Sequence, residues 1–451
     1  MNESRQYVVQ GRRDSEADRV GFMVDNMPTN KAYTYAATRA GSDHDGAILA
    51  AFRQRFKNYR DGWRGNPKRV FAERLHHESF RRAALPPLCV DIEVAACCDL
   101  VCPFCYRQAI ATPDKLMSTR LFYRLIDQCA ELGVPSIKLN WRGEPLLHPR
   151  LPEFIDYAKR AGIFEVIINT NAVALTRQTS EAIVAAGLDL LIYSFDGGSK
   201  ETYEKMRVGR FRRNSFEAVY GNVRRFAEVR TRAQSVFPRT KIQMILTSDT
   251  SKETEDFSDL FANCVDDVSV KAYTERGGGL PDLDAESRDV LISALREHGL
   301  PEDSPHWRDM DGNIWAATGR IFCEQPNQRL MVAYDGRVSM CCYDWGSAYP
   351  VGYVDEAALA RGDRDYQEVI TKARVGAKGF EGLSRIEMPR RLIEPQPVVQ
   401  TLREVWNGEI INAVRQRHIE GAPEEVPICR DCTFKETYQW RRVHVVGNGK
   451  P

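Results

Sequence analysis

The stretch Cys98-Asp-Leu-Val-Cys102-Pro-Phe-Cys105-Tyr106 places three cysteines in a C-x3-C-x2-C spacing, directly after an apolar run at residues 88–95. Three thiolates on so short a loop can converge on one metal centre, and such soft ligands suit iron–sulfur clusters, zinc or copper. A four-iron cluster held by three cysteines keeps one iron open for a small chelating cofactor. A zinc site is the alternative, because thiolate-rich loops commonly hold zinc.

Short apolar runs alternate with helical patterns from residue 88 onward, which predicts an α/β fold. Parallel strands with right-handed crossovers are expected, and six strand–helix units make three-quarters of a (β/α)8 barrel. The expected strands span residues 89–94, 136–140, 165–169, 188–194, 241–247 and 267–271. The expected helices span residues 118–132, 151–161, 177–186, 214–232 and 253–263. In parallel barrels the chemistry lies on loops that follow the strands, as the three-cysteine loop does.

The cysteine spacing, with Tyr106 directly after the third cysteine, resembles the signature of the radical S-adenosylmethionine (SAM) enzymes. The resemblance implies that Cys98, Cys102 and Cys105 hold a [4Fe–4S] cluster whose open iron chelates SAM. One electron from the cluster cleaves SAM to methionine and a 5′-deoxyadenosyl radical, which abstracts a substrate hydrogen. The resemblance also implies a partial (β/α)6 TIM-like barrel and a flavodoxin or ferredoxin as electron donor.

Residues after the later strands match the SAM-binding positions of that family. The segment Trp141-Arg142-Gly143-Glu144-Pro145 resembles a G-G-E-P motif that contacts the SAM amino group, with Arg142 in place of the first glycine. A tight turn needs the glycine, and an oxygen acceptor suits an ammonium group. The guanidinium fork of Arg207 suits the SAM carboxylate, although Arg207 could instead be a charge on a helix surface. The resemblance assigns to SAM binding the residues Tyr106, Gly143, Glu144, Asn169, Ser194 and Arg207.

A second cysteine set lies near the C-terminal end of the chain. Residues 330–340 predict a hairpin with an Asp-Gly turn, which would bring Cys323 and Cys341 towards each other. Cys429 and Cys432, in a C-x2-C spacing, can supply two further ligands. This pattern resembles the Twitch form of the SPASM extension of radical SAM enzymes, which implies a second, auxiliary [4Fe–4S] cluster. A four-cysteine zinc ribbon is the alternative.

The substrate is predicted less directly than the cofactors. The overall pattern resembles radical SAM enzymes of aminoglycoside pathways, a diol dehydratase and an aminocyclitol dehydrogenase. That resemblance implies a small aminosugar-like or aminocyclitol substrate. Modification of a ribosomal peptide is the alternative, and a zinc-ribbon scaffold is a third. Candidates for substrate binding and proton transfer are the inward strand-end residues Glu93, Lys138, Asn140, Lys271 and Tyr273, each of which could equally be a buried structural group.

Composition and length bound the rest of the prediction. The 451 residues carry a net charge of +1, so no global field argues for nucleic acid or a membrane. Without an apolar leader or a long apolar run, the chain is expected to be cytoplasmic. The expected domains are an N-terminal extension at 1–84, a radical SAM core at 85–280 and an auxiliary cluster domain at 281–451. The extension, with helical patterns at 46–59 and 70–80, either caps the active site or packs as an appendage. Residues 355–400 are expected to be a surface insertion.

Overall fold

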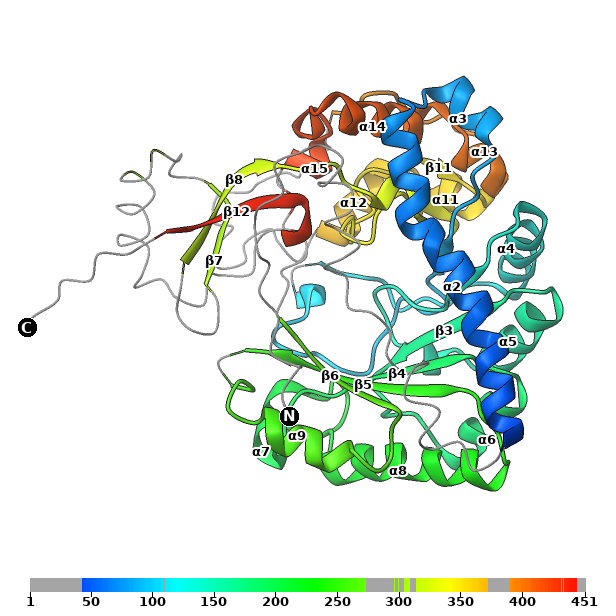
Figure 1. Cartoon of the computed structure of the whole chain (residues 1–451), viewed down its shortest axis with the longest axis vertical. Helices are drawn as coiled ribbons and strands as arrows, with labels where there is room; N and C mark the ends of the chain where they lie inside the picture. Colours follow the sequence, from blue (N-terminus) through cyan, green and yellow to red (C-terminus); the bar gives the residue numbers. More distant parts are fainter. Residues whose placement is uncertain are drawn as a thin grey trace, which may run out of the picture.

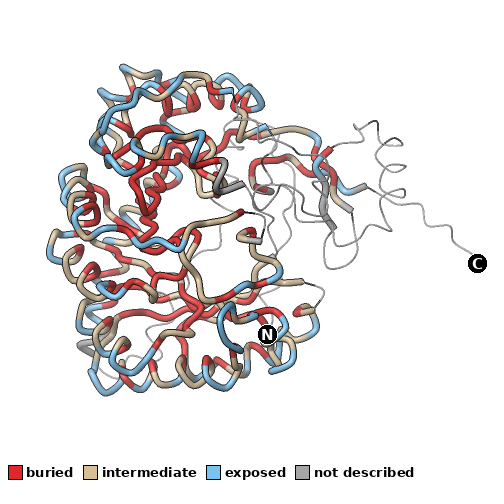
Figure 2. Tube along the Cα trace, turned by 180° about the vertical axis from the view of Figure 1, so that it is seen from behind, coloured by how far each residue is buried: buried red, intermediate tan, exposed pale blue. Residues whose placement is uncertain are grey.

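The computed structural model describes residues 43–108, 110–247, 249–272, 296, 299, 304–308, 314–371, 390–430, 432 and 434–443. A nine-stranded sheet runs through this part of the chain in the order β11-β10-β9-β1-β2-β3-β4-β5-β6. Helices cover its outer side, and the buried backbone follows the strands (Figures 1 and 2). The predicted α/β fold with a partial barrel is confirmed.

The six central strands are parallel and pair in chain order. They are β1 (Cys89–Ile92), β2 (Ser136–Lys138), β3 (Glu165–Thr170), β4 (Leu190–Ser194), β5 (Arg239–Leu246) and β6 (Asp267–Ala272). The helices between them are α4 (Thr119–Leu132), α5 (Leu151–Arg160), α6 (Arg177–Ala185), α7 (Lys200–Met206), α8 (Phe216–Arg232) and α9 (Thr254–Phe261). Short α7 was missed, because its seven residues follow a polar loop without a full apolar period.

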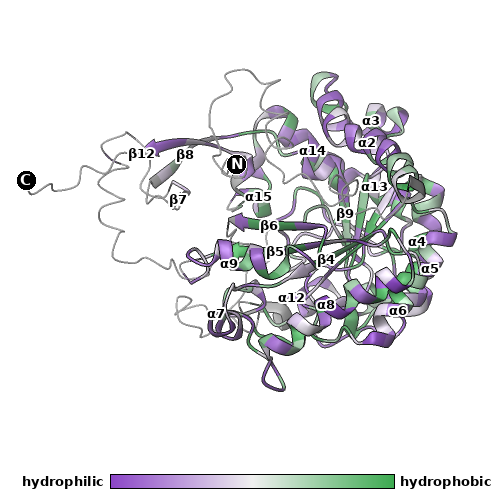
Figure 3. Ribbon diagram, turned by 60° about the horizontal axis from the view of Figure 1, so that its bottom comes forward, coloured by the Kyte–Doolittle hydropathy of each residue, from purple (hydrophilic) through white to green (hydrophobic). Residues whose placement is uncertain are grey.

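Helix ends follow the capping signals in the sequence. The Ser118 side chain accepts a hydrogen bond from the Leu121 backbone N–H at the start of α4, and Gly133 ends that helix with a φ of 77°. The buried face of α4 packs on α5, where the rings of Phe122 and Phe154 stack with centroids 3.9 Å apart. Apolar strand residues and the inner faces of the helices together form the core (Figure 3).

Alternation along β5 shows which side chains line the inner face of the barrel. Ile242 and Met244 are fully buried in the core that the outer helices share. Since successive strand residues point to opposite faces, Lys241 and Gln243 lie on the inner face. The register places Ser269 of β6 beside Gln243. The inner face therefore carries polar side chains where β5 and β6 pair.

The N-terminal helix α2 (Asp43–Ala72) closes the barrel at the amino ends of the strands. Phe52 packs on Leu190 at the start of β4. About two turns further on, the Tyr59 hydroxyl donates to the Glu165 carboxylate at the start of β3. Trp63 packs with Leu88 and Cys89 at the start of β1. The helix thus packs at the end of the barrel opposite to the three-cysteine loop, which favours the packing interpretation over the cap for residues 43–72.

The rest of the N-terminal extension differs from the predicted helix at 70–80. The chain leaves α2 at Ala72 and begins α3 (His77–Ala83) only after a turn in which Arg74 has a φ of 46°. The prediction of one helix there was wrong, because the apolar residues on either side of the turn keep a helical spacing by chance. Residues 1–42 lie outside the described part of the chain.

The C-terminal part joins the same sheet instead of forming a detached unit. Strand β9 (Arg329–Val332) pairs in parallel with β1, and β10 (Arg337–Ser339) and β11 (Gly352–Tyr353) follow in antiparallel order. The predicted Asp-Gly turn is present, with Gly336 at a φ of 91°. A second, three-stranded sheet contains β7 (His306–Arg308), β8 (Ile314–Arg320) and β12 (Tyr438–Val443). The division of the chain at residues 84 and 280 stays a proposal.

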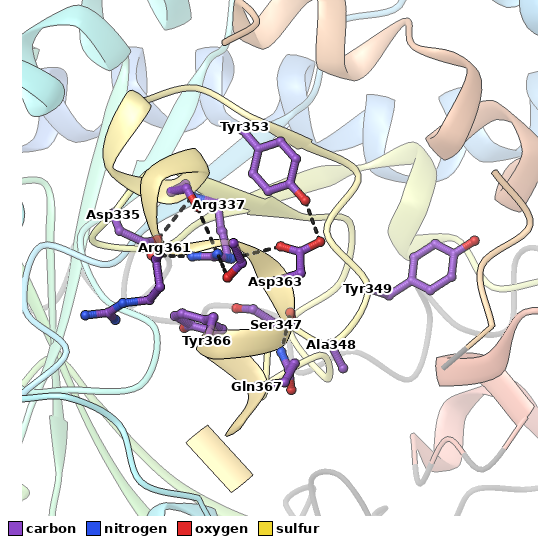
Figure 4. Close-up of polar contacts among 12 residues, drawn as sticks. Asp335, Arg337, Ser347, Ala348, Tyr349, Tyr353, Arg361, Asp363, Tyr366 and Gln367 are labelled. Carbon is purple, nitrogen blue, oxygen red and sulfur yellow. Dashed lines mark hydrogen bonds and ion pairs between the residues drawn. The ribbon is translucent and has the colours of Figure 1, made fainter. Parts of the chain in front are cut away.

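The helices of this part are α11 (Glu356–Arg361), α12 (Asp363–Thr371), α13 (Leu402–Trp406), α14 (Glu409–Glu420) and α15 (Pro427–Arg430). The prediction that residues 355–400 form a surface insertion is wrong for its first part. Arg337 is fully buried and donates to Asp335 at 2.6 Å and to the Gly362 carbonyl at 2.7 Å, as Figure 4 illustrates around Arg337. Its guanidinium lies 4.0 Å from the ring centroid of Tyr366, a fully buried residue of α12. Within this segment, the Asp363 carboxylate pairs with the buried side chains of Arg337 and Arg391, which the composition alone did not reveal.

None of the helices in the described part of the chain combines the length and apolar composition that a bilayer crossing requires.

Candidate functional site

The three-cysteine loop is docked directly on the turn that follows β2. The Glu144 backbone N–H donates to the Cys97 carbonyl at 2.8 Å. A Cβ at Gly143 would approach the carbonyl oxygens of Ala95 and Cys97 more closely than real Cβ atoms approach backbone. Glycine is therefore needed for the space between the two loops, whereas the sequence had suggested a conformational need of the turn itself.

The three cysteines lie on one short loop with hydrogen-bond donors around them. Cys102 is buried, and the Cys105 N–H donates to its carbonyl at 3.0 Å. Arg207 Nη1 lies 3.8 Å from the Cys102 sulfur, and Asn171 Nδ2 lies 3.9 Å from the Cys98 sulfur. Burial raises the pKa of Cys98 to about 12 and that of Cys102 to about 11. Three thiols on one short loop, with nitrogen donors near two of their sulfurs, are a donor set that fits an iron–sulfur cluster.

The Glu144 carboxylate is held inside the protein by the end of β3. Its two oxygens accept hydrogen bonds from the Thr170 hydroxyl at 2.6 Å and from the Asn171 backbone N–H at 2.8 Å. Burial raises the pKa of Glu144 to about 7, although these hydrogen bonds act in the opposite direction. The side chain therefore fixes the turn, and the SAM contact predicted for Gly143 and Glu144 stays a prediction.

Three of the predicted residues form a row across the carboxyl ends of β2, β3 and β4. The Asn169 backbone N–H donates to Asn140 Oδ1 at 3.1 Å, and Asn169 Nδ2 donates to Ser194 Oγ at 3.1 Å. All three side chains are half-buried. The structure therefore brings together two residues predicted for SAM and one predicted for the substrate, at the mouth of the barrel beside the three-cysteine loop.

Arg207 ends α7 and points into the protein instead of lying on a helix surface. Its Nη2 pairs with Asp196 Oδ2 at 2.5 Å, and its guanidinium lies 5.4 Å from the ring centroid of Phe104 in the cysteine loop. Burial lowers the pKa of Arg207, but Asp196, Cys102 and Tyr203 together outweigh that effect and the net shift is upward. Asp196 was missed by the sequence reasoning, although it follows the β4 strand end by only two residues. The predicted SAM contact of Arg207 stays a prediction.

Glu93 occupies a buried ion pair, which argues against its predicted role in proton transfer. Both carboxylate oxygens lie 2.6 Å from nitrogen atoms of Arg142, and the Tyr334 N–H also donates to one of them. Arg142 reaches on to the Trp345 carbonyl at 2.9 Å and to the Tyr366 hydroxyl at 3.0 Å. The arginine that replaces a glycine of the motif thus connects the SAM-side turn to the C-terminal part.

The remaining predicted residues are placed at the barrel mouth or beyond the described residues. Lys138 and Lys271 are half-buried on β2 and β6. Tyr273 lies outside the described part of the chain. Tyr106 is buried, and its ring meets that of Trp345 edge-on with centroids 5.9 Å apart. Sequence reasoning did not single out the inner-face residues Lys241, Gln243, Asp267 and Ser269, which strict alternation along β5 and β6 could have identified.

The second cysteine set converges although it is spread along the chain. Cys323, Cys341, Cys429 and Cys432 line one cavity of about 20 Å³. Backbone N–H groups of Tyr343 and Phe434 donate to the sulfurs of Cys341 and Cys432 at 3.3 and 3.4 Å. Burial raises the pKa of Cys323 to about 12. Buried thiols that already receive N–H donors fit an iron–sulfur cluster.

Comparison with protein families gives two matches. Residues 92–261 match the radical SAM superfamily, and residues 323–372 match SPASM, an iron–sulfur cluster-binding domain. The chain is 37% identical over 131 residues to a GTP 3′,8-cyclase of Chlorobaculum tepidum, which covers 29% of this chain and 38% of that protein. It is 36% identical over 107 residues to a PqqA peptide cyclase of Xanthomonas oryzae, which covers 24% and 28%. The chain thus matches less than half the length of these relatives.

Comparison with solved structures gives two further similarities. BtrN in complex with AdoMet and 2-DOIA is 14% identical, with 76% of this chain and 92% of that chain covered and a TM-score of 0.39. SuiB of Streptococcus suis bound to its precursor peptide SuiA is 15% identical, with 75% and 70% covered and a TM-score of 0.45.

Proposed function

We propose that this chain catalyses a radical reaction on a small, polar aminosugar or aminocyclitol. The chain carries a radical SAM domain and a SPASM domain, and so it uses SAM and iron–sulfur clusters. When bound, the cluster and SAM supply a 5′-deoxyadenosyl radical that removes hydrogen from carbon. The hydrogen is taken from a carbon that bears a hydroxyl group. The outcome is either loss of water from the adjacent carbon, as in a diol dehydratase, or oxidation to the ketone. In the first case the external reductant would supply one electron, and solvent one proton, to the product radical; in the second the auxiliary cluster would accept one electron from the substrate radical.

One observation supports a polyhydroxylated or aminated substrate above all others. Gln243 Oε1 and Ser269 Oγ are buried atoms on the inner face of the barrel, and neither has a hydrogen-bond partner among the described residues. The two residues are register partners on adjacent strands. Buried acceptors without donors are costly. A substrate that presents neighbouring hydroxyl or ammonium groups would satisfy both.

We assign roles to Gln243, Ser269 and the polar residues around them. Directly below it, Lys241 and Asp267 form a buried ion pair at 2.8 Å, which closes the floor of the site. Lys271 lies two residues above Ser269 on the same face of β6. In the proposed reaction Gln243 and Ser269 orient the substrate hydroxyls. Lys271 Nζ, or Lys138 Nζ from the opposite side, delivers a proton to a departing hydroxyl.

The test uses the full chain, reconstituted anaerobically with SAM and a reductant, and a panel of aminosugars and aminocyclitols. We expect substrate-dependent 5′-deoxyadenosine, with deuterium transferred into it from a substrate labelled at the reacting carbon. Gln243→Leu should raise KM at least tenfold without changing the affinity for SAM. Gln178→Leu, on the exposed face of α6, is the matched control. The proposal fails if no member of the panel stimulates 5′-deoxyadenosine formation.

Peptide modification is the second candidate. Within the described part of the chain β6 is an edge strand of the large sheet. An extended peptide can add to such an edge through backbone hydrogen bonds. Stimulation of 5′-deoxyadenosine formation by a peptide, and by no aminosugar, would select this function.

A further inference from the structure

His418 is a buried histidine beside the second cysteine set. It lies in the last turn of α14 and is 2% exposed. It lines the same cavity as Cys323, Cys341, Cys429 and Cys432. Its ring also meets Phe322, the neighbour of Cys323, edge-on with centroids 6.4 Å apart. The imidazole is therefore fixed by packing against the wall of that cavity.

Neither nitrogen of this imidazole has a hydrogen-bond partner among the described residues. Burial, with Arg320 nearby, lowers the pKa of His418 to about 3, so the ring is neutral and carries one N–H donor and one acceptor. Buried polar groups are nearly always paired, and an unpaired one marks a missing water, ion or ligand. The group that belongs in a cavity lined by four cysteines is an iron–sulfur cluster, and its sulfur atoms accept N–H donors.

We infer that His418 donates its ring N–H to a sulfur of the auxiliary cluster and thereby sets the reduction potential of that cluster. Four cysteines supply one ligand to each of four irons, so no iron is left for the imidazole. Hydrogen bonds to cluster sulfurs withdraw electron density and make reduction easier. His418 is therefore a positioning residue for electron transfer at this cluster, distinct from the backbone donors Tyr343 and Phe434.

The first experiment compares reduction potentials in the reconstituted full chain by redox titration monitored by electron paramagnetic resonance. His418→Leu should lower the potential of the auxiliary cluster so that its reduced fraction falls about tenfold at fixed potential, about 59 mV for one electron. His418→Asn keeps an N–H donor and should restore at least half of that shift. The SAM-binding cluster and the iron content should stay unchanged in both variants.

His77→Leu is the matched control, because the His77 ring also forms a hydrogen bond, in which Nε2–H donates to the Asn407 carbonyl oxygen at 2.8 Å, away from the cysteines. An unchanged auxiliary potential in His418→Leu with full iron content would overturn the inference. Loss of one iron from the auxiliary cluster in that variant would also overturn it, since it would make His418 a ligand.

A measurement on the unmodified protein covers the case in which the variants do not fold. Histidine labelled with 15N should give a weak hyperfine coupling to the reduced auxiliary cluster, as expected for an N–H···S contact. A strong coupling would indicate direct iron ligation, and the absence of any coupling would place His418 away from the cluster. Either result would contradict the inference.

Discussion

The two cysteine sites of this protein are built in opposite ways. Cys98, Cys102 and Cys105 lie within one loop, and the loop rests on the turn that follows β2 through the Cys97 carbonyl. Cys323, Cys341, Cys429 and Cys432 come from distant segments and meet in a closed cavity. The first site is a local motif on a barrel, and the second exists only when the C-terminal part is folded. This difference predicts which substitutions act locally and which act on the whole assembly.

The largest expected effect separates the chemical roles of the two sites. Cys102→Ala should abolish SAM cleavage because the cluster that binds SAM is lost, while about four irons per chain remain in the auxiliary cluster. Cys341→Ala should lose the auxiliary irons but keep SAM cleavage in the absence of substrate. Iron analysis and chromatography of 5′-deoxyadenosine measure both. SAM cleavage that survives in Cys102→Ala would show that the three-cysteine loop does not hold the SAM-binding cluster.

The contact between the two halves should show the next largest effect. Arg142→Met leaves the Glu93 carboxylate buried and unpaired, which should cost about 3–5 kcal/mol of the free energy of unfolding. In Glu93→Leu with Arg142→Met the unpaired charge is gone, so most of that loss should be recovered. Denaturant titration of both variants measures the free energy of unfolding. A double variant no more stable than the single one would show that the charge pair is not the cause.

Gly143→Ala tests the docking of the cysteine loop on the β2 turn. The added Cβ would push against the carbonyls of Ala95 and Cys97, so stability should fall by about 2–3 kcal/mol and SAM should bind more weakly. Gly221→Ala, in α8 with open space around its Cα, should instead stabilise by about 1 kcal/mol. Thermal unfolding and SAM titration distinguish them. Normal SAM binding in Gly143→Ala would show that the two loops are not tightly docked.

The smallest expected effect concerns the pH dependence of the first site without metal. The pKa of Glu144 is about 7 in the folded chain and about 4.3 when unfolded. The folded state therefore binds the proton more tightly, and stability is lost as pH rises through this range. Between pH 5 and pH 7 the loss should be about 2 kcal/mol.

Glu144→Gln removes this titration, so its melting temperature should depend less on pH than that of the wild type. Asp189, whose pKa burial raises to about 6, remains in both proteins and cancels in the comparison. Equal pH profiles for the two proteins would contradict the assignment of this carboxyl group.

Much of the fold could be predicted because it depends on short patterns. The six parallel strands lie within a few residues of their predicted positions, since each carries apolar residues, either in a run or in alternation, between turn residues. The hairpin β9–β10 was expected from its Asp-Gly turn, but its parallel pairing with β1 was not. Pairing between segments more than two hundred residues apart leaves no local signal.

The candidate site, like the fold, could be predicted where it depends on local spacing and not where it depends on contacts between distant segments. Cysteine spacing alone indicated the two metal sites and their seven ligands, whose roles stay predictions. The burial of Glu93 against Arg142, the ion pair of Arg207 with Asp196 and the approach of His418 to the second cysteine set were not predictable. Each of these depends on which side chain fills the space beside another, and spacing along the chain does not encode that.

The sequence by itself determined the local patterns of this protein: the spacing of the three-cysteine loop, the Asp-Gly turn and the alternation of strands and helices, because each depends on neighbouring residues. Only the tertiary structure decided how the second cysteine set closes, which polar atoms line the barrel and how Arg142 connects the two halves. These features arise from packing between distant segments, where burial removes water and makes every unpaired charge or hydrogen-bonding group costly.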